Sequence, residues 1–349
     1  MWQLENRTPF AAERAWVRDR DGAEVWLVAV KCTFQVHANG ATEVAAEQPP
    51  VLRGPQYCGE GGGSSIRFDA DLVLTKTTTD IILVGHAYAP RGRPATDVQV
   101  DLCVGQLRKS LRVFGDRRWG RLGPSAPEVF TAVPLVYERA YGGVDPKAPD
   151  PKHGWEPRNP VGTGFAAERG HLDGVALPNI ELPGKLIADW DDRPPPAGFG
   201  VIASHWQPRC AFAGSYDERW LKERQPLLPD DFDERFFQCA PLDQQSAEFL
   251  QGDEPVVLRN LTPTGELRFV LPRVQLSFET RFFDGEKRVH ETSNLHTVIL
   301  EPDLSRVSLV WHTALPCHTK VQKLDRTVIS SDSAPRFIDP DEYTDSPVG

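Results

Sequence analysis

The chain has 349 residues, of which 40% are hydrophobic, so it can bury a core and is not generally disordered. Its formal net charge of −10 repels phosphate backbones and anionic lipid surfaces, so we expect neither nucleic acid nor a membrane as a partner. No secretory signal is recognisable, and no apolar stretch approaches the ~20 residues of a membrane span, so we expect a cytoplasmic protein. The six scattered cysteines, none in a CxxC pair, are then expected to be free thiols.

The first third of the chain has the residue pattern of β-strands. Residues 24–34, 80–88, 96–104 and 110–113 are rich in β-branched and aromatic side chains and are separated by turn residues. In the third of these stretches every second residue is apolar, which places four side chains on one face of a strand: Val98, Val100, Leu102 and Val104.

The middle of the chain, 124–208, is rich in Gly, Pro, Trp and Asn and has little periodicity. Because a structureless loop of this length is unusual in a compact domain, we expect short ordered pieces held in place by aromatic residues. Two short helices are predicted after it. One begins at Ser215 and runs through Trp220, and the other covers 243–250 and ends at Gly252.

The last third returns to strands. Residues 256–259 and 267–271 flank one turn, and 295–300 and 307–311 flank another. Asp284-Gly285 is a strong hairpin signal between alternating runs. The pattern predicts a mainly β protein, a β-sandwich or two packed antiparallel sheets with long ordered loops and a few short helices.

The expected organisation is one large domain over 1–330 with a loosely held acidic tail over 331–349. An alternative has two β lobes, about 1–123 and 253–330, joined by the loop-rich middle, 124–252. The composition alone leaves both arrangements open.

No motif gives a clear enzymatic or metal-binding signature. His312, Cys317 and His318 are possible zinc ligands, but no second pair has zinc-finger spacing, so a structural role is preferred. The loop Cys58-Gly59-Glu60-Gly61-Gly62-Gly63-Ser64-Ser65 precedes a strand-like run and lacks the helix that a phosphate loop needs. No Gly-x-Ser-x-Gly elbow is present. We therefore expect no catalytic residue, no metal and no cofactor.

Paired carboxylates and loop aromatics admit more than one interpretation. Asp69 with Asp71, Asp191 with Asp192 and Asp230 with Asp231 fit ordinary acidic loops, and a glycosidase pair requires a spatial separation that sequence does not show. The aromatic residues of the middle region fit three roles: stacking on sugars, anchoring a protein interface, or pinning loops onto the sheets.

In their order and number, several stretches make the chain resemble the bacterial family called domain of unknown function 2169, over roughly residues 10 to 315. The stretches include Val30-Lys31-Cys32-Thr33-Phe34, Gly85-His86-Ala87-Tyr88-Ala89-Pro90, Tyr137-Glu138-Arg139-Ala140-Tyr141-Gly142-Gly143, Arg158-Asn159-Pro160-Val161-Gly162, Leu177-Pro178-Asn179-Ile180-Glu181, Pro196-Ala197-Gly198-Phe199-Gly200 and Trp206-Gln207-Pro208-Arg209.

The resemblance implies a role in type VI secretion. Members of the family are associated with adaptors or chaperones that bind a toxic effector and help load it onto the spike protein VgrG, often with a PAAR-type tip. An adaptor of this kind is not an enzyme. The alternative that we keep open is a carbohydrate-binding or carbohydrate-cleaving β-protein, which the Trp-rich loops and abundant carboxylates would suit.

The candidate protein-binding residues lie in the central loops: Trp155, Arg158, Asn159, Asn179, Glu181 and Trp206. For Arg158, Asn159 and Glu181 a structural alternative is that they bond the backbone of the loops. Asp71, Lys76 and Asp80 are interpreted in the same way, as a structural charge cluster.

Overall fold

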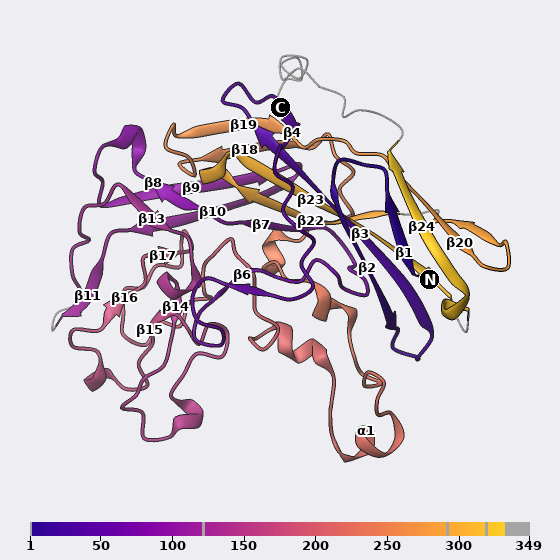
Figure 1. Ribbon diagram of the computed structural model, residues 1–349. Helices are drawn as coiled ribbons and strands as arrows, with labels where there is room; N and C mark the ends of the chain where they lie inside the picture. Colours follow the sequence, from indigo (N-terminus) through magenta and orange to yellow (C-terminus); the bar gives the residue numbers. More distant parts are fainter. Residues whose placement is uncertain (1, 121–122, 291–292, 318–319, 332–349) are drawn as a thin grey trace.

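The computed structural model describes residues 2–120, 123–290, 293–317 and 320–331, and its main feature is a pair of packed sheets (Figure 1). The first sheet has six strands in the order β2-β3-β23-β22-β7, with β4 paired to β3. All neighbours are antiparallel except β7, which runs parallel to β22. The strands are β2 (Ala11–Arg18), β3 (Glu24–Val36), β4 (Thr42–Val44), β7 (Asp80–Leu83), β22 (Asn294–Glu301) and β23 (Arg306–Pro316).

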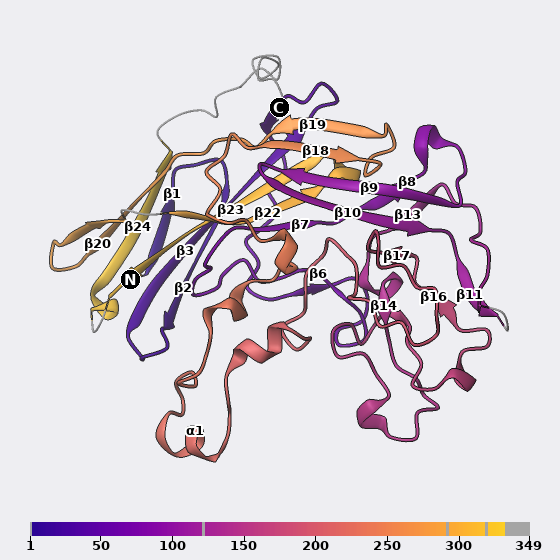
Figure 2. The same ribbon diagram turned by 180° about the vertical axis from the view of Figure 1, so that it is seen from behind.

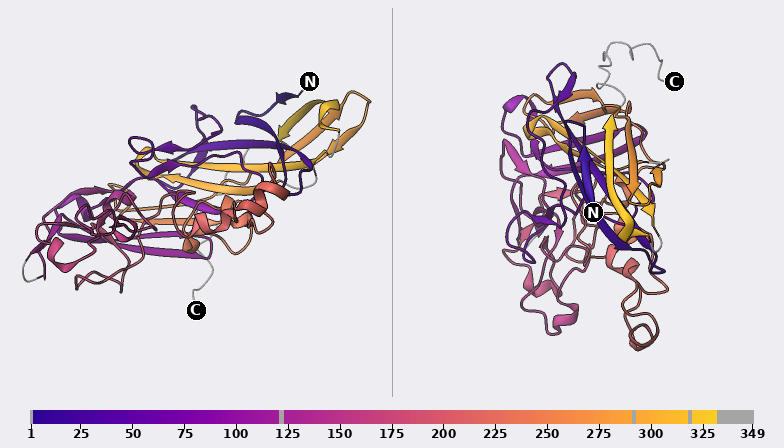
Figure 3. Two further views of the ribbon diagram at one scale, coloured as in Figure 1. Left: turned by 90° about the horizontal axis from the view of Figure 1, so that it is seen from below. Right: turned by 45° about the vertical axis from the view of Figure 1, so that its right-hand side comes forward.

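The second sheet has five antiparallel strands in the order β17-β10-β9-β18-β19. They are β9 (Asp97–Val104), β10 (Leu107–Phe114), β17 (Ile180–Glu181), β18 (Pro255–Arg259) and β19 (Glu266–Val270). Seen from below, the two sheets form separate layers (Figure 3, left). This arrangement confirms the predicted fold class.

The core between the two layers follows the alternation of the strands. The predicted apolar face of β9 is buried in it, and so are Trp26, Val28 and Val30 of β3. The intervening residues of β3 point to the opposite face of the six-stranded sheet because side chains alternate along a strand. That face carries Lys31 and Thr33, which are buried under loops.

A third sheet of four strands extends the same core. Its order is β1-β24-β20-β21, with β1 parallel to β24. Phe278 and Ile329 belong to the main core, and the predicted hairpin at Asp284-Gly285 is confirmed. The strands are β1 (Gln3–Asn6), β20 (Leu276–Phe282), β21 (Lys287–Val289) and β24 (Leu324–Ser331).

The loop-rich region forms the lower part of the molecule in Figures 1 and 2 and consists of short ordered pieces, as predicted. Two small apolar clusters hold it, one around Tyr137 and Trp206 and the other around Trp119 and Tyr141. The short strands here and in the adjoining loops are β5 (Gln56–Tyr57), β6 (Ile66–Phe68), β8 (His86–Tyr88), β11 (Arg117–Gly120), β12 (Gly123–Pro124), β13 (Ala132–Pro134), β14 (Tyr141–Gly142), β15 (Thr163–Gly164) and β16 (Ala176–Leu177).

The two predicted helices differ from the structure. Helix α1 (Glu218–Glu223) is capped by the Asp217 side chain, which accepts from the Trp220 amide, whereas Ser215 bonds to Asp231. The predicted helix over 243–250 was wrong: only a single 3-10 turn, η7 (Leu242–Gln244), forms there.

Tertiary contacts explain the missing helix. The fully buried amide of Gln244 donates to the carbonyl oxygens of Ile81 (2.7 Å) and Phe199 (2.9 Å). The Ser246 amide donates to the carbonyl oxygen of Thr79. The segment therefore runs along the open edge of β7 and forms hydrogen bonds to its backbone. A buried sheet edge needs such partners because its polar groups cannot bond to water.

The predicted strand over 80–88 is divided. After β7 the chain leaves the six-stranded sheet at Val84-Gly85, and β8 pairs with β13 instead.

Both large sheets combine strands from 1–123 with strands from 253–330. The expected acidic tail lies almost entirely outside the described residues. None of the helices in the described ranges is long and apolar enough to cross a membrane.

Candidate functional site

The stretch Arg158-Asn159-Pro160-Val161-Gly162 crosses Tyr141-Gly142-Gly143 at very close range. The fully buried Asn159 amide donates to the carbonyl oxygens of Tyr137 (2.8 Å) and Tyr141 (3.0 Å). A Cβ atom on Gly142, whose φ is +152°, would lie 2.1 Å from the Asn159 carbonyl oxygen. Only glycine permits this approach. Asn159 therefore bonds the loop backbone and presents no surface to a partner.

Asn179 and Glu181 are also buried and bonded within the chain. Glu181 forms an ion pair with Arg117 and accepts from the Ile187 amide at 2.8 Å. Burial raises the pKa of the Glu181 carboxyl, and Arg117 opposes that rise. Asn179 donates to Asp116 at 2.9 Å. Both side chains connect the five-stranded sheet to the loops and are not accessible in this conformation.

The remaining candidates divide between interior and surface. Trp206 is buried and packs edge-on against Tyr137, with 5.7 Å between ring centroids. Trp155 is 38% exposed. Arg158 is half-buried and forms a bidentate pair with Glu156, with both N–O distances at 2.7 Å. Of the six candidate residues, Trp155 and Arg158 are the two that a partner could contact.

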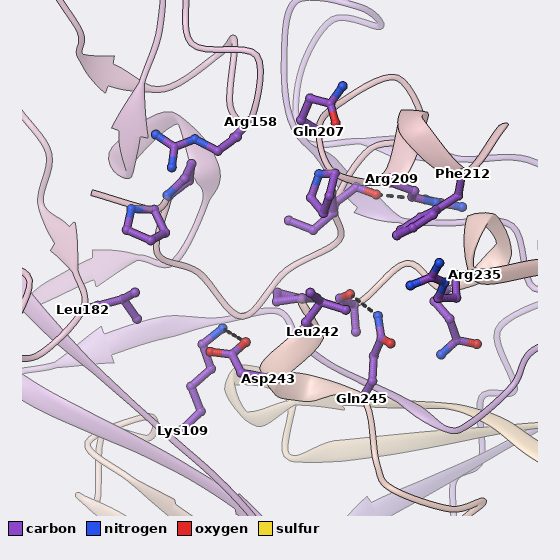
Figure 4. Close-up of a pocket in the computed structure, with 17 residues that line it drawn as sticks. Lys109, Arg158, Leu182, Gln207, Arg209, Phe212, Arg235, Leu242, Asp243 and Gln245 are labelled. Carbon is purple, nitrogen blue, oxygen red and sulfur yellow. Dashed lines mark hydrogen bonds and ion pairs between the residues drawn. The ribbon is translucent and has the colours of Figure 1, made fainter. Parts of the chain in front are cut away.

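Arg158 also lines a pocket of about 310 Å³ between the five-stranded sheet and the central loops (Figure 4). The floor is formed by Lys109 of β10, and the rim by the 3-10 turns η5 (Arg209–Ala213), η6 (Glu234–Phe237) and η7. Its walls are largely apolar and include Leu182, Pro195, Pro196, Phe212, Pro241 and Leu242.

Lys109 and Arg209 are buried charges of this pocket. The Lys109 ammonium group donates to Asp243 Oδ1 at 2.7 Å and to Gln244 Oε1 at 2.8 Å. Burial lowers the pKa of Lys109, while Asp243 acts in the opposite direction. Figure 4 shows Lys109 and Asp243 on one side of the pocket and Arg158 on the other.

Two further arginines line the pocket. Arg235 stacks on Phe212, with its guanidinium carbon 4.3 Å from the ring centroid, and pairs with Asp233. Arg209 forms an ion pair with Asp69 at 2.6 Å and donates to the Phe236 carbonyl oxygen. The pocket thus combines apolar walls with cations that intrachain contacts hold in place.

Asp71, Lys76 and Asp80 belong to a buried charge layer beneath the loops on the outer face of the six-stranded sheet. Lys76 lies 2.6 Å from Asp80, and Lys31 lies 3.0 Å from Asp71. Burial alone would lower the pKa of Lys76, but the contact with Asp80 raises it. These residues form two separate ion pairs that attach the covering loops to the sheet, as expected of a structural charge cluster.

A second pocket of about 350 Å³ contains a histidine and a cysteine. His86 Nδ1 lies 2.7 Å from Asp303, whose other oxygen accepts from the Tyr88 hydroxyl at 2.8 Å. Cys58 lies on the lining, in the loop between the paired strands β5 and β6. Burial raises the pKa of the Cys58 thiol, which is the opposite of what activates a nucleophilic cysteine.

No group of three or more His, Cys, Asp and Glu side chains among the described residues could hold a metal ion. His312 is buried and stacks on His296, with 4.6 Å between ring centroids, and burial lowers the pKa of His312 to about 3. His318 lies outside the described residues.

Sequence reasoning missed Lys109 and Leu242. A signal for Lys109 was present, because it shares one face of a strand with Leu107, Leu111 and Val113, where a charge is unusual. Leu242 follows a proline in a loop and has no pattern that predicts its place at the pocket.

Three of the stretches that carry the family resemblance contribute to the first pocket, through Arg158, Pro196 and Gln207-Pro208-Arg209. No curated protein and no solved structure matches the chain. Residues 21–312, however, match the family model described as "Uncharacterized protein conserved in bacteria (DUF2169)". The chain therefore belongs to the DUF2169 family.

Proposed function

We propose that this protein is a type VI secretion adaptor that binds a toxic effector and helps load it onto the VgrG spike, with or without a PAAR-type tip. It acts in the cytoplasm, because loading precedes secretion. The observation that carries the proposal is the position of the first pocket. It is open, its walls are largely apolar, and family-like stretches from three separate parts of the chain contribute to it.

The physical state of the loops also supports a binding role. Several of their polar groups accept hydrogen bonds from buried side chains of the same chain, such as Asn159, Asn179 and Gln244. A surface that is already ordered loses little conformational entropy when a partner binds, so more of the contact energy appears as affinity. Irregular but rigid loops are therefore suited to holding a folded protein.

Neither pocket favours the carbohydrate alternative. Among the residues that the structure describes, no tryptophan lines either of them, and Asp243 is the single carboxylate of the first pocket. A glycosidase needs two carboxyl groups across the scissile bond. The second pocket holds Glu301 and Asp303, but Glu301 is paired with Arg306 at 2.6 Å and Asp303 with His86.

The proposal is tested with the purified full chain, the effector encoded beside it and the corresponding VgrG. We expect a stable complex with the effector that buries on the order of 1,200 Å² or more. Deleting the gene for this chain should remove that effector from the secreted fraction while VgrG is still secreted. Unchanged effector secretion in the deletion strain, together with no complex in vitro, would refute the proposal.

A further inference from the structure

The first pocket has hydrogen-bond donors that the chain itself does not use. An ammonium group has three donors, and Lys109 uses two of them, on Asp243 and Gln244. Arg158 bonds Glu156 through Nε and Nη2, and Arg235 bonds Asp233 through the same two atoms. The Nη1 atoms of both arginines have no hydrogen bond to the described residues. These unused donors are suited to an acceptor from outside the chain.

The charge of the pocket is opposite to that of the whole protein. The chain carries a net charge of −10, yet the described residues that line the pocket include four cations and one carboxylate. The acids that pair with its arginines, Glu156, Asp69 and Asp233, are not part of the lining. A bound group would therefore face guanidinium and ammonium donors more than carboxylates, which favours an anionic ligand.

The walls require an apolar group beside that charge. Leu242 is 67% exposed at the rim, next to Pro241, and Pro195 and Pro196 face the same space. An apolar surface of this kind in a concave site is typical of a pocket that receives an anchoring side chain. Proline walls lose no backbone freedom when they are covered, so packing against them has a low entropic cost.

We propose that this pocket binds a peptide segment of the partner in which an aliphatic side chain lies next to an aspartate or glutamate. The aliphatic group packs between Leu242 and the prolines. The carboxylate accepts hydrogen bonds from Lys109 on the floor and from Arg158 on the opposite wall. The identification of that partner as the effector rests on the proposed function, whereas the peptide chemistry rests on the pocket alone.

The test uses the full chain and a random dodecapeptide display library. Peptides selected on the immobilised protein are labelled and titrated by fluorescence anisotropy. We expect enrichment of sequences that place Leu, Ile or Val within two positions of Asp or Glu. Leu242→Glu, at an exposed position, should weaken their binding at least about tenfold, and so should Lys109→Met. The matched controls Leu221→Glu on α1 and Lys152→Met on an exposed turn should stay within about twofold.

Several results would overturn the inference. The first is enrichment of basic or purely apolar peptides. The second is a selection on the original protein that enriches no more than a selection on the Leu242→Glu protein. The third is peptide affinity that Leu242→Glu leaves unchanged. Leu242→Glu also keeps the test valid if Lys109→Met does not fold, because the Leu242 side chain is mostly solvent-exposed.

The two proposals fail in different ways. Selection of acidic apolar peptides by a chain that never binds effector or VgrG would remove the adaptor role and leave the pocket assignment intact. If Leu242→Glu abolishes peptide binding but not effector binding, the adaptor role stands, and the effector does not use this pocket.

Discussion

Replacing Asn159 with alanine tests whether this residue holds the loops or is free for a partner. The change removes both donors of the amide. The Tyr141 carbonyl oxygen then loses the Asn159 hydrogen bond, while the Tyr137 carbonyl oxygen keeps the Ala140 amide at 3.1 Å. A buried carbonyl without a partner costs about 1–3 kcal/mol and a lost hydrogen bond about 1 kcal/mol, so we expect a loss of about 2–4 kcal/mol in the free energy of unfolding.

The assay is urea unfolding followed by tryptophan fluorescence, in which a shifted midpoint at constant slope reports stability. Asn39→Ala is the matched control, because Asn39 is exposed in a turn and its side chain bonds only the Ala41 amide among the described residues. We expect Asn159→Asp to destabilise more than Asn159→Ala, because a carboxylate cannot donate to two carbonyls. Equal midpoints for Asn159→Ala and Asn39→Ala would refute the structural role.

Three further predictions concern ionisable groups. Burial lowers the pKa of His290 to about 4 and that of His312 to about 3. As the pH falls, these histidines are therefore protonated in the unfolded chain at a higher pH than in the folded protein. Stability should therefore change little above pH 7 and fall by roughly 2 kcal/mol per histidine between pH 7 and pH 5, and midpoints that do not change with pH would contradict this. Lys76→Met leaves the buried Asp80 without its cation and should cost about 3–5 kcal/mol, whereas Lys152→Met should leave the unfolding midpoint unchanged. Cys58 should react first with a maleimide, while the buried Cys32 and Cys239 should react only after unfolding; mass spectrometry of digests checks this order, and early labelling of Cys32 would disprove it.

Strand pairing was predictable wherever a local signal determined it. The alternation from Val98 to Val104 and the turn at Asp284-Gly285 each specify a strand face or a hairpin through a few neighbouring residues. The two-sheet architecture follows from many such strands, each of which has an apolar face to bury. The predicted pairs on either side of Pro302 were correct for the same reason.

The failed helix over 243–250 shows where local information ends. Its residues have adequate helix propensity, but propensity is weak compared with tertiary contacts. The Gln244 amide completes the edge of β7, a strand more than 150 residues earlier in the sequence. No pattern within the segment identifies that edge.

The candidate site has a similar limit. A polar residue in a glycine-rich loop can bond either the loop itself or another protein. The amino-acid sequence around Asn159 or Glu181 does not distinguish these two roles. The choice depends on burial, which the fold alone decides. Lys109 is the exception, since a lysine on the apolar face of a strand indicates a buried charge that requires partners.

The hydrogen-bonding side chains of the loops and those of the pocket have different roles, and this difference connects the loop architecture to binding. Ordered loops without regular secondary structure must supply hydrogen bonds to their own backbone, and in this protein Asn159, Glu181 and Gln244 do so. Because these side chains are buried, they are not accessible to a ligand. At the pocket, by contrast, Lys109 and Arg158 are held by intrachain acids and still keep unused donors. Because their positions are fixed before any ligand arrives, an acidic group can bind them without the entropic cost of ordering two long side chains.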